Sequence, residues 1–129
     1  DLDEALRIRQ QEELPVYEKL RNMDGIIHVL WSCSRIRVAQ GINDQETLDR
    51  ILSDLAQAYT LAKQLTRLDA ICAVASDLGQ HLVVVGMVEE ARSLFIEARD
   101  GYTKLGFASG VAQMEAWLEH LESNQSPET

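Results

Sequence analysis

Apolar side chains recur every three or four residues through most of the chain, which is the spacing of one face of an α-helix. The clearest stripe predicts a helix over residues 44–67, and a second stripe predicts one over 87–104. The first stripe consists of Leu48, Ile51, Leu52, Leu55, Tyr59, Ala62 and Leu65, and the second of Val88, Ala91, Phe95, Ala98, Tyr102 and Leu105. Weaker stripes predict further helices over residues 2–21, 25–40, 70–85 and 109–122. The fold class is therefore all-α, with about six helices.

Three positions refine these predicted helices. Asn43, followed by Glu46 three residues later, is similar to a capping box and places the start of the helix over 44–67. Pro15 lies inside the first helix, where a proline removes a hydrogen bond, so we expect a kink or a break near 11–15. The run Leu82-Val83-Val84-Val85 has the composition of a strand. Its alignment with residues 37–40, described next, favours a helix there instead.

The chain contains an internal repeat. Three stretches align without gaps: LRNMDGIIHVLWSCSR from Leu20, LTRLDAICAVASDLGQ from Leu65, and LGFASGVAQMEAWLEH from Leu105. Each has a polar residue that we expect to cap the next helix, then a small residue, then a β-branched residue. The polar residues are Asp24, Asp69 and Ser109, and the small residues are Gly25, Ala70 and Gly110. The first two copies also continue to a glycine, Gly41 and Gly86, which suits the end of a helix.

The opening stretch LDEALRIRQQEELPVYEKL is similar to MVEEARSLFIEARDGYTKL, which follows Gly86. Tyr17 pairs with Tyr102 in this alignment, and we place Tyr59 at the corresponding position of the middle copy. The chain is therefore expected to begin in the second helix of a repeat. A helix pair of this kind cannot bury its own apolar stripe, so we expect the pairs to stack on one another.

These residues resemble the long form of the tetratricopeptide repeat, as found in kinesin light chains and in many bacterial regulators. Leu78-Gly79, Gly86, Ala91, Phe95 and Ala98 fall at the family's spacing. The resemblance implies a right-handed α-α superhelix, a solenoid of antiparallel helix hairpins. It covers residues 1–122, which we expect to be the C-terminal part of a longer array. Residues 123–129 are expected to form a disordered polar tail.

Composition excludes several classes of function. The net charge of −9 argues against binding to nucleic acid, because such proteins neutralise phosphates with Lys and Arg. The longest apolar run is about seven residues, whereas a membrane span needs roughly 20. His28, His81 and His120 are far apart and belong to no metal-binding motif. Cys33 and Cys72 are interpreted as small core residues. We expect a cytoplasmic protein with no catalytic residues, no metal site and no cofactor.

In the tetratricopeptide family the first helix of each repeat lines a concave groove that holds a peptide or a partner helix. Counting from Gly41 and Gly86 predicts which residues face this groove. They are His28, Trp31, Arg35 and Val38, then Ala73, Ser76, Gln80 and Val83, and finally Gln113, Ala116 and His120. Trp and Arg are enriched among the residues that dominate binding energy, so Trp31 and Arg35 are candidate anchors. Alternatively, Trp31 packs on the adjacent repeat and Arg35 is a solvated charge.

The charges of these three helices form a gradient. Residues 26–40 carry Arg35 and Arg37 without an acid, residues 71–85 carry only Asp77, and residues 111–122 carry Glu115, Glu119 and Glu122. A partner with one acidic and one basic end could be oriented by this gradient. The family members that bind chaperone tails need several cations on these faces. The corresponding positions here offer only Arg35.

Three functions are consistent with this sequence. The first is a non-catalytic scaffold that binds a protein or peptide in the groove. The second is self-association into a homo-oligomer through the N-terminal helix, using Leu2, Ala5, Leu6 and Ile8. The third is the regulatory or sensor end of a larger multidomain signalling protein, such as a nucleotide-driven regulator.

Overall fold

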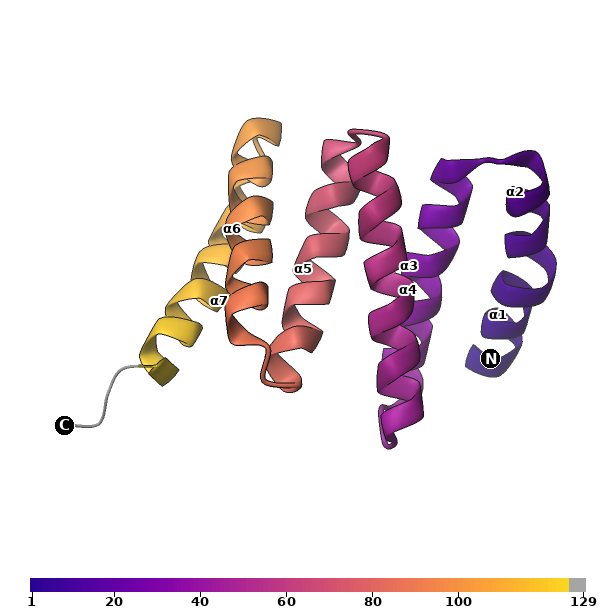
Figure 1. Ribbon diagram of the computed structural model, residues 1–129, viewed down its shortest axis with the longest axis horizontal. Helices are drawn as coiled ribbons and strands as arrows, with labels where there is room; N and C mark the ends of the chain where they lie inside the picture. Colours follow the sequence, from indigo (N-terminus) through magenta and orange to yellow (C-terminus); the bar gives the residue numbers. More distant parts are fainter. Residues whose placement is uncertain (126–129) are drawn as a thin grey trace. The chain divides into compact units, whose positions relative to one another are not determined.

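The computed structural model describes residues 1–125, with side chains up to residue 123, and these residues form helices joined by short turns. The elements are α1 (Leu2–Arg7), the π-helix η1 (Ile8–Glu13), α2 (Leu14–Leu20), α3 (Met23–Gln40), α4 (Gln45–Gln64), α5 (Leu68–Val84), α6 (Val88–Leu105) and α7 (Ala108–Gln125). They divide into two compact units, residues 1–67 and residues 68–129. Figure 1 shows the helices coloured along the chain. No helix among the described residues is both long and apolar enough to cross a membrane.

The all-α prediction is confirmed, and the helix bounds lie close to the predicted ones. The run Leu82–Val85 is not a strand, because α5 continues to Val84 and a turn follows at Val85 and Gly86. The last helix is longer than expected, so residues 123–125 of the predicted tail are helical. The remainder of that tail, residues 126–129, lies outside the described residues.

The predicted break before Pro15 takes the form of a π-helix. The backbone of η1 widens by one residue per turn, and the N–H of Leu14 donates to the carbonyl of Arg9, five residues earlier. Pro15 then lies in the first turn of α2, where it has no N–H to continue the hydrogen bonding of the preceding turn. The carbonyl that its ring would crowd, that of Gln11, belongs to the widened segment. The first helix is therefore one rod with a π-helical turn in its middle.

Two predicted caps are wrong by one or two residues. Asn22, not Asp24, caps α3 by accepting a hydrogen bond from the N–H of Gly25 at 3.0 Å. Asp44, not Asn43, caps α4 by accepting from the N–H of Thr47 at 2.7 Å, a bond that lowers the pKa of the Asp44 carboxyl. A cap must precede the helix in an extended conformation, whereas Asp24 is already helical. Asp69 and Ser109 likewise lie inside the first turns of α5 and α7.

The same turn ends α2, α4, α5 and α6. At each of them a residue with positive φ follows the helix, and two backbone hydrogen bonds close the last turn, as in a Schellman motif. These residues are Arg21, Thr66, Gly86 and Gly106. Gly86 and Gly106 suit this conformation because they lack a Cβ atom. Three of these four turns occupy the same position in each copy of the internal repeat, at Arg21, Thr66 and Gly106. The fourth turn is at Gly86, one of the glycines that were predicted to end a helix.

A tyrosine ring lies against a helical glycine at two of these turns. A Cβ atom on Gly25 would lie 2.5 Å from Cδ1 of Tyr17, and one on Gly110 would lie 2.7 Å from Cγ of Tyr102. The absence of a side chain therefore lets α2 approach α3, and α6 approach α7. Tyr17 and Tyr102 each lie three residues before the leucine that opens a copy of the repeat, and Ala62 has that position in the middle copy. The prediction that Tyr59 corresponds to the two tyrosines is therefore wrong by three residues.

A buried ion pair joins α3 and α4 in the first unit. Arg37 donates from Nη1 to Oδ2 of Asp54 at 2.5 Å, and the side chains are only 7% and 19% exposed. With the side-chain amide of Gln10, in η1, turned so that its oxygen faces the donors, that oxygen accepts hydrogen bonds from Arg37 and from Arg50. Buried apolar side chains of α3 and α4 form the core of this unit, among them Ile26, Val29, Leu30, Cys33, Ile51 and Leu55. The η1 segment is thus attached to the α3–α4 hairpin by polar contacts.

The tyrosine–glycine contact leads to a first prediction. The variant Gly25→Ala is expected to lose about 1–3 kcal/mol of stability, because its Cβ collides with the ring of Tyr17. In a Tyr17→Ala background, the same Gly25→Ala change is expected to stabilise the chain by about 1 kcal/mol, since alanine favours a helix over glycine. Urea unfolding followed by circular dichroism measures the wild type and the three variants of the cycle. An equal effect of Gly25→Ala in both backgrounds would contradict the contact.

Candidate functional site

The predicted groove residues of α3 share one face of that helix. His28, Arg35 and Val38 are exposed, and Trp31 is half-buried. The guanidinium carbon of Arg35 lies 4.5 Å from the centroid of the Trp31 ring, which is a cation–π contact within one helix. The two candidate anchors therefore form one surface feature, in which the guanidinium of Arg35 covers part of the indole ring of Trp31.

The predicted groove residues of α5 are less accessible. Ser76 is buried, with 5% of its surface exposed, and its hydroxyl accepts a hydrogen bond from Nε2 of Gln80 at 3.3 Å. Ala73, Gln80 and Val83 are half-buried. Ser76 shares the buried face of α5 with Cys72 and Gly79, one turn away on either side. Its hydroxyl is therefore internal, and the prediction that Ser76 faces a partner does not fit its burial.

The predicted groove residues of α7 do come together. Gln113, Ala116 and His120 are exposed and line a depression of about 250 Å³ with Trp117. Trp117 was not among the predicted residues, because the count from the repeat selects 113, 116 and 120 and places it at the edge of that face. The residue type could have indicated it, because Trp117 is one of only two tryptophans in a chain with few aromatic residues.

Trp117 is held by stacking contacts that run through the second unit. Its ring stacks on Phe95 of α6, with centroids 5.4 Å apart and planes 18° from parallel. Phe95 is fully buried, and a Cβ atom on Gly79 of α5 would lie 2.7 Å from Cε1 of its ring. The ring of His120 also meets Trp117 edge to face, with the ring centroids 5.8 Å apart. These contacts therefore order the indole ring in the chain without a partner.

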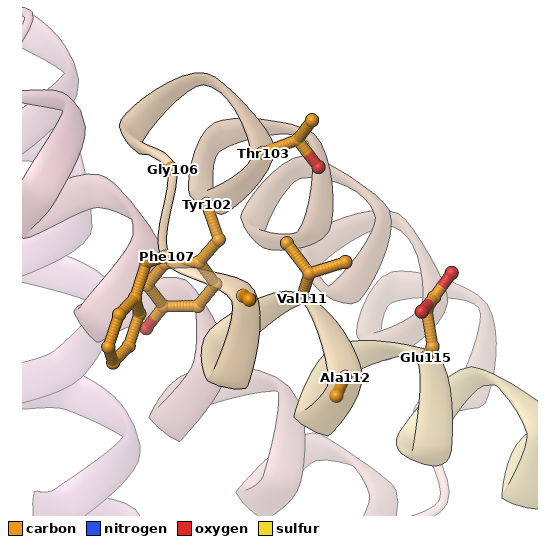
Figure 2. Close-up of a pocket in the computed structure, with 8 residues that line it drawn as sticks. Tyr102, Thr103, Gly106, Phe107, Val111, Ala112 and Glu115 are labelled. Carbon is orange, nitrogen blue, oxygen red and sulfur yellow. The ribbon is translucent and has the colours of Figure 1, made fainter.

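A second hollow lies at the turn between α6 and α7, which Figure 2 shows in close-up. It has a volume of about 340 Å³, and sequence reasoning did not identify it. The rings of Tyr102 and Phe107 meet edge to face at 5.4 Å, and Phe107 is 52% exposed. Val111 and Ala112 continue the apolar surface along α7, and Glu115 follows one turn later. We call this hollow the α6–α7 corner.

The predicted charge gradient changes once burial is known. Arg37 is buried against Asp54, so on α3 only Arg35 of the two counted cations is exposed. On α7 the acidic residues Glu115, Glu119 and Glu122 are all exposed. The exposed charge of α3 is therefore smaller than the sequence count indicates, and the acidic character of α7 is unchanged.

Other reactive groups lie away from these surfaces. Cys33 and Cys72 are buried free thiols, and burial raises the pKa of each, which keeps them protonated near neutral pH. Among the described residues, no group of three or more His, Cys, Asp or Glu side chains is arranged to hold a metal ion.

The predicted self-association edge is partly covered. Leu2 and Ile8 are exposed at 42% and 36%, whereas Ala5 and Leu6 are half-buried. Nε2 of Gln40 donates to Oδ1 of Asp3 at 2.6 Å, which ties the end of α3 to α1. Two residues that were not predicted, Val16 and Leu20 of α2, are more exposed, at 53% and 69%.

The stacked rings lead to a second prediction, measured in a Trp31→Phe background where Trp117 is the only tryptophan. Gly79→Ala is expected to displace Phe95, to shift the fluorescence of Trp117 to longer wavelength and to cost about 1–3 kcal/mol. Gly25→Ala, an equivalent change in the other unit, is the matched control and is expected to leave the emission unchanged. Unaltered emission in the folded Gly79→Ala protein would refute the proposed positioning of Trp117.

Comparison with known proteins found no matching family model, no matching curated protein and no matching solved structure. The resemblance to the tetratricopeptide repeat therefore stays a prediction that rests on the residues quoted above. The candidate surfaces are accordingly interpreted from their own geometry.

Proposed function

We propose that this chain is a non-catalytic interaction module that binds a polypeptide partner. The observation that carries the proposal is the depression on α7, where Trp117 is stacked on Phe95 and flanked by exposed Gln113 and His120. An aromatic side chain that is already ordered loses little conformational entropy when a partner covers it. Tryptophan is also among the residue types that contribute most to binding energy at protein interfaces.

The polar neighbours of Trp117 suit a peptide. The side-chain amide of Gln113 can donate and accept hydrogen bonds, and the imidazole of His120 offers a further polar group. A peptide backbone carries one donor and one acceptor at nearly every residue, and those groups need partners when an interface excludes water. An aromatic surface with polar groups at its margin can bind an apolar side chain and the backbone beside it.

The face of α3 supplies a second aromatic surface of the same kind. His28, Trp31, Arg35 and Val38 lie along it, and the Arg35 guanidinium lies over the Trp31 ring. The proposal includes the right-handed superhelix that the resemblance implies, and each aromatic face is a candidate contact surface by itself.

A random-peptide phage library selected on the purified chain tests this function. Peptides enriched on the wild type are expected to lose at least about tenfold in affinity for Ala116→Arg, which fills the Trp117 depression with a large side chain. The double variant Trp31→Ala/Arg35→Glu tests the α3 face in the same assay. Fluorescence anisotropy with synthetic copies of the peptides gives the dissociation constants.

The matched control is Ala56→Arg, the same substitution at an exposed position of α4 outside the proposed surfaces. It is expected to leave these affinities unchanged, provided that circular dichroism shows equal helix content in all variants. Failure to enrich any peptide that distinguishes Ala116→Arg from Ala56→Arg, together with no effect of the α3 variant, would overturn the proposed function.

Self-association is a second candidate, favoured by the exposure of Val16 and Leu20 one turn apart on α2. If this surface joins two copies, the mass in sedimentation velocity should rise with concentration. A Val16→Glu/Leu20→Glu variant should stay monomeric, because each glutamate would have to be buried without a partner. Leu6→Glu tests the originally predicted edge in the same way. A mass that never changes with concentration would exclude this candidate.

A further inference from the structure

The α6–α7 corner combines an apolar hollow with an acidic margin. Its walls are the rings of Tyr102 and Phe107 and the side chains of Val111 and Ala112, and its volume is about 340 Å³. Figure 2 shows Val111 between the two aromatic rings and the carboxylate of Glu115. Hollows of roughly 300 Å³ or more are large enough to take a ligand group, and this one can accept a bulky apolar side chain.

The acidic margin continues along the same flank of α7. Ala108, Ala112, Glu115, Glu119 and Glu122 follow each other at intervals of three or four residues, which places them on one helical face. The three glutamates are exposed. The nearest cation in sequence is Lys104 at the end of α6, and no Lys or Arg follows it up to Thr129. The negative charge beside the hollow is therefore not balanced by cations on α7 itself.

This flank is separate from the Trp117 depression. Residues 111, 112 and 115 lie on one side of the buried seam of Met114 and Leu121, and residues 113, 117 and 120 lie on the other. A partner can therefore be tested at the corner independently of the depression.

We propose that the α6–α7 corner is a second docking site, specific for a basic amphipathic segment of another protein. The segment inserts an apolar side chain between Phe107 and Val111 and places Lys or Arg residues against Glu115 and Glu119. The spacing of these carboxylates matches cations one or two helical turns beyond the anchor. A second acidic copy of this chain, with its net charge of −9, fits this margin poorly.

Electrostatic attraction and the burial of apolar surface contribute differently to binding at this site. The carboxylates are exposed, so they attract the segment and fix its direction, and their effect weakens as salt is added. The hollow removes apolar surface of the anchor from water, which contributes in proportion to the area covered and responds little to salt. A segment needs both features to bind well.

Three synthetic fluorescent peptides of one design test the site by anisotropy at low salt. The first is an amphipathic helix with leucine and phenylalanine on one face and lysine on the other. The second replaces each lysine by glutamate, and the third replaces the apolar residues by serine. Binding of the first peptide, with at least about tenfold weaker binding of the other two, is expected. Equal binding of the first and third peptides would overturn the proposal, because the hollow would then be unused.

Variants of the chain then locate the binding. Glu115→Lys/Glu119→Lys is expected to weaken the first peptide at least about tenfold, and Phe107→Ala about fivefold. Glu18→Lys/Glu90→Lys is the matched control, since it replaces two exposed glutamates elsewhere and changes the net charge equally. It is expected to stay within about twofold of the wild type, because distant exposed charges are screened. All variants should first show unchanged urea midpoints.

Three results would reject the site. The first is a loss of binding in the control as large as in the α7 variant, which would show attraction by net charge alone. The second is a loss of peptide binding in Ala116→Arg but not in Glu115→Lys/Glu119→Lys, which would assign the peptide to the Trp117 depression. The third is a concentration-dependent dimer that Glu115→Lys/Glu119→Lys abolishes in a chain that binds no peptide, which would make a second copy the occupant. The proposed function can survive each of these results, because its own test uses Ala116→Arg and the α3 face.

Discussion

The contact of Phe95 with Gly79 organises the second unit. Because Gly79 has no side chain, the ring of Phe95 lies directly against α5, and the same ring stacks on Trp117 of α7. Three helices are thereby connected through one buried ring. A larger residue at Gly79 would have to move Phe95, and any movement of Phe95 is passed to Trp117 because interiors are closely packed. The geometry of the surface depression therefore depends on a glycine two helices away.

The first unit is held together by different means. Its N-terminal rod packs its tyrosine on Gly25 and connects to the α3–α4 hairpin through Gln10, Arg37 and Asp54. A buried ion pair gives little net stability, because desolvation offsets most of the attraction, but leaving either partner alone is costly. Such a pair favours one packing arrangement over others. The π-helical turn belongs to the same arrangement, since it carries Gln10 and adapts the rod to Pro15.

The two flanks of α7 differ in chemistry although they belong to one helix. The flank with Trp117 offers an ordered ring with amide and imidazole groups beside it, and it suits a peptide with little charge. The flank with Phe107 and Val111 leads into exposed carboxylates and suits a basic segment. One helix can display both because the two flanks lie on either side of its buried seam, Met114 and Leu121. The proposed module could therefore engage two different segments.

The sequence by itself determined the helices, because apolar spacing, proline and glycine act within a few residues of their own position. It also determined the repeat and, within α7, the face that carries Gln113, Ala116 and His120. Only the tertiary structure decided that Ser76 and Arg37 are buried, that Asn22 and Asp44 supply the caps, and that Trp117 is fixed by Phe95. It alone revealed the α6–α7 corner, where Tyr102 and Phe107 meet Val111 and Ala112. Periodicity locates a face of one helix, but a hollow and a buried polar group exist only when side chains from separate helices pack together.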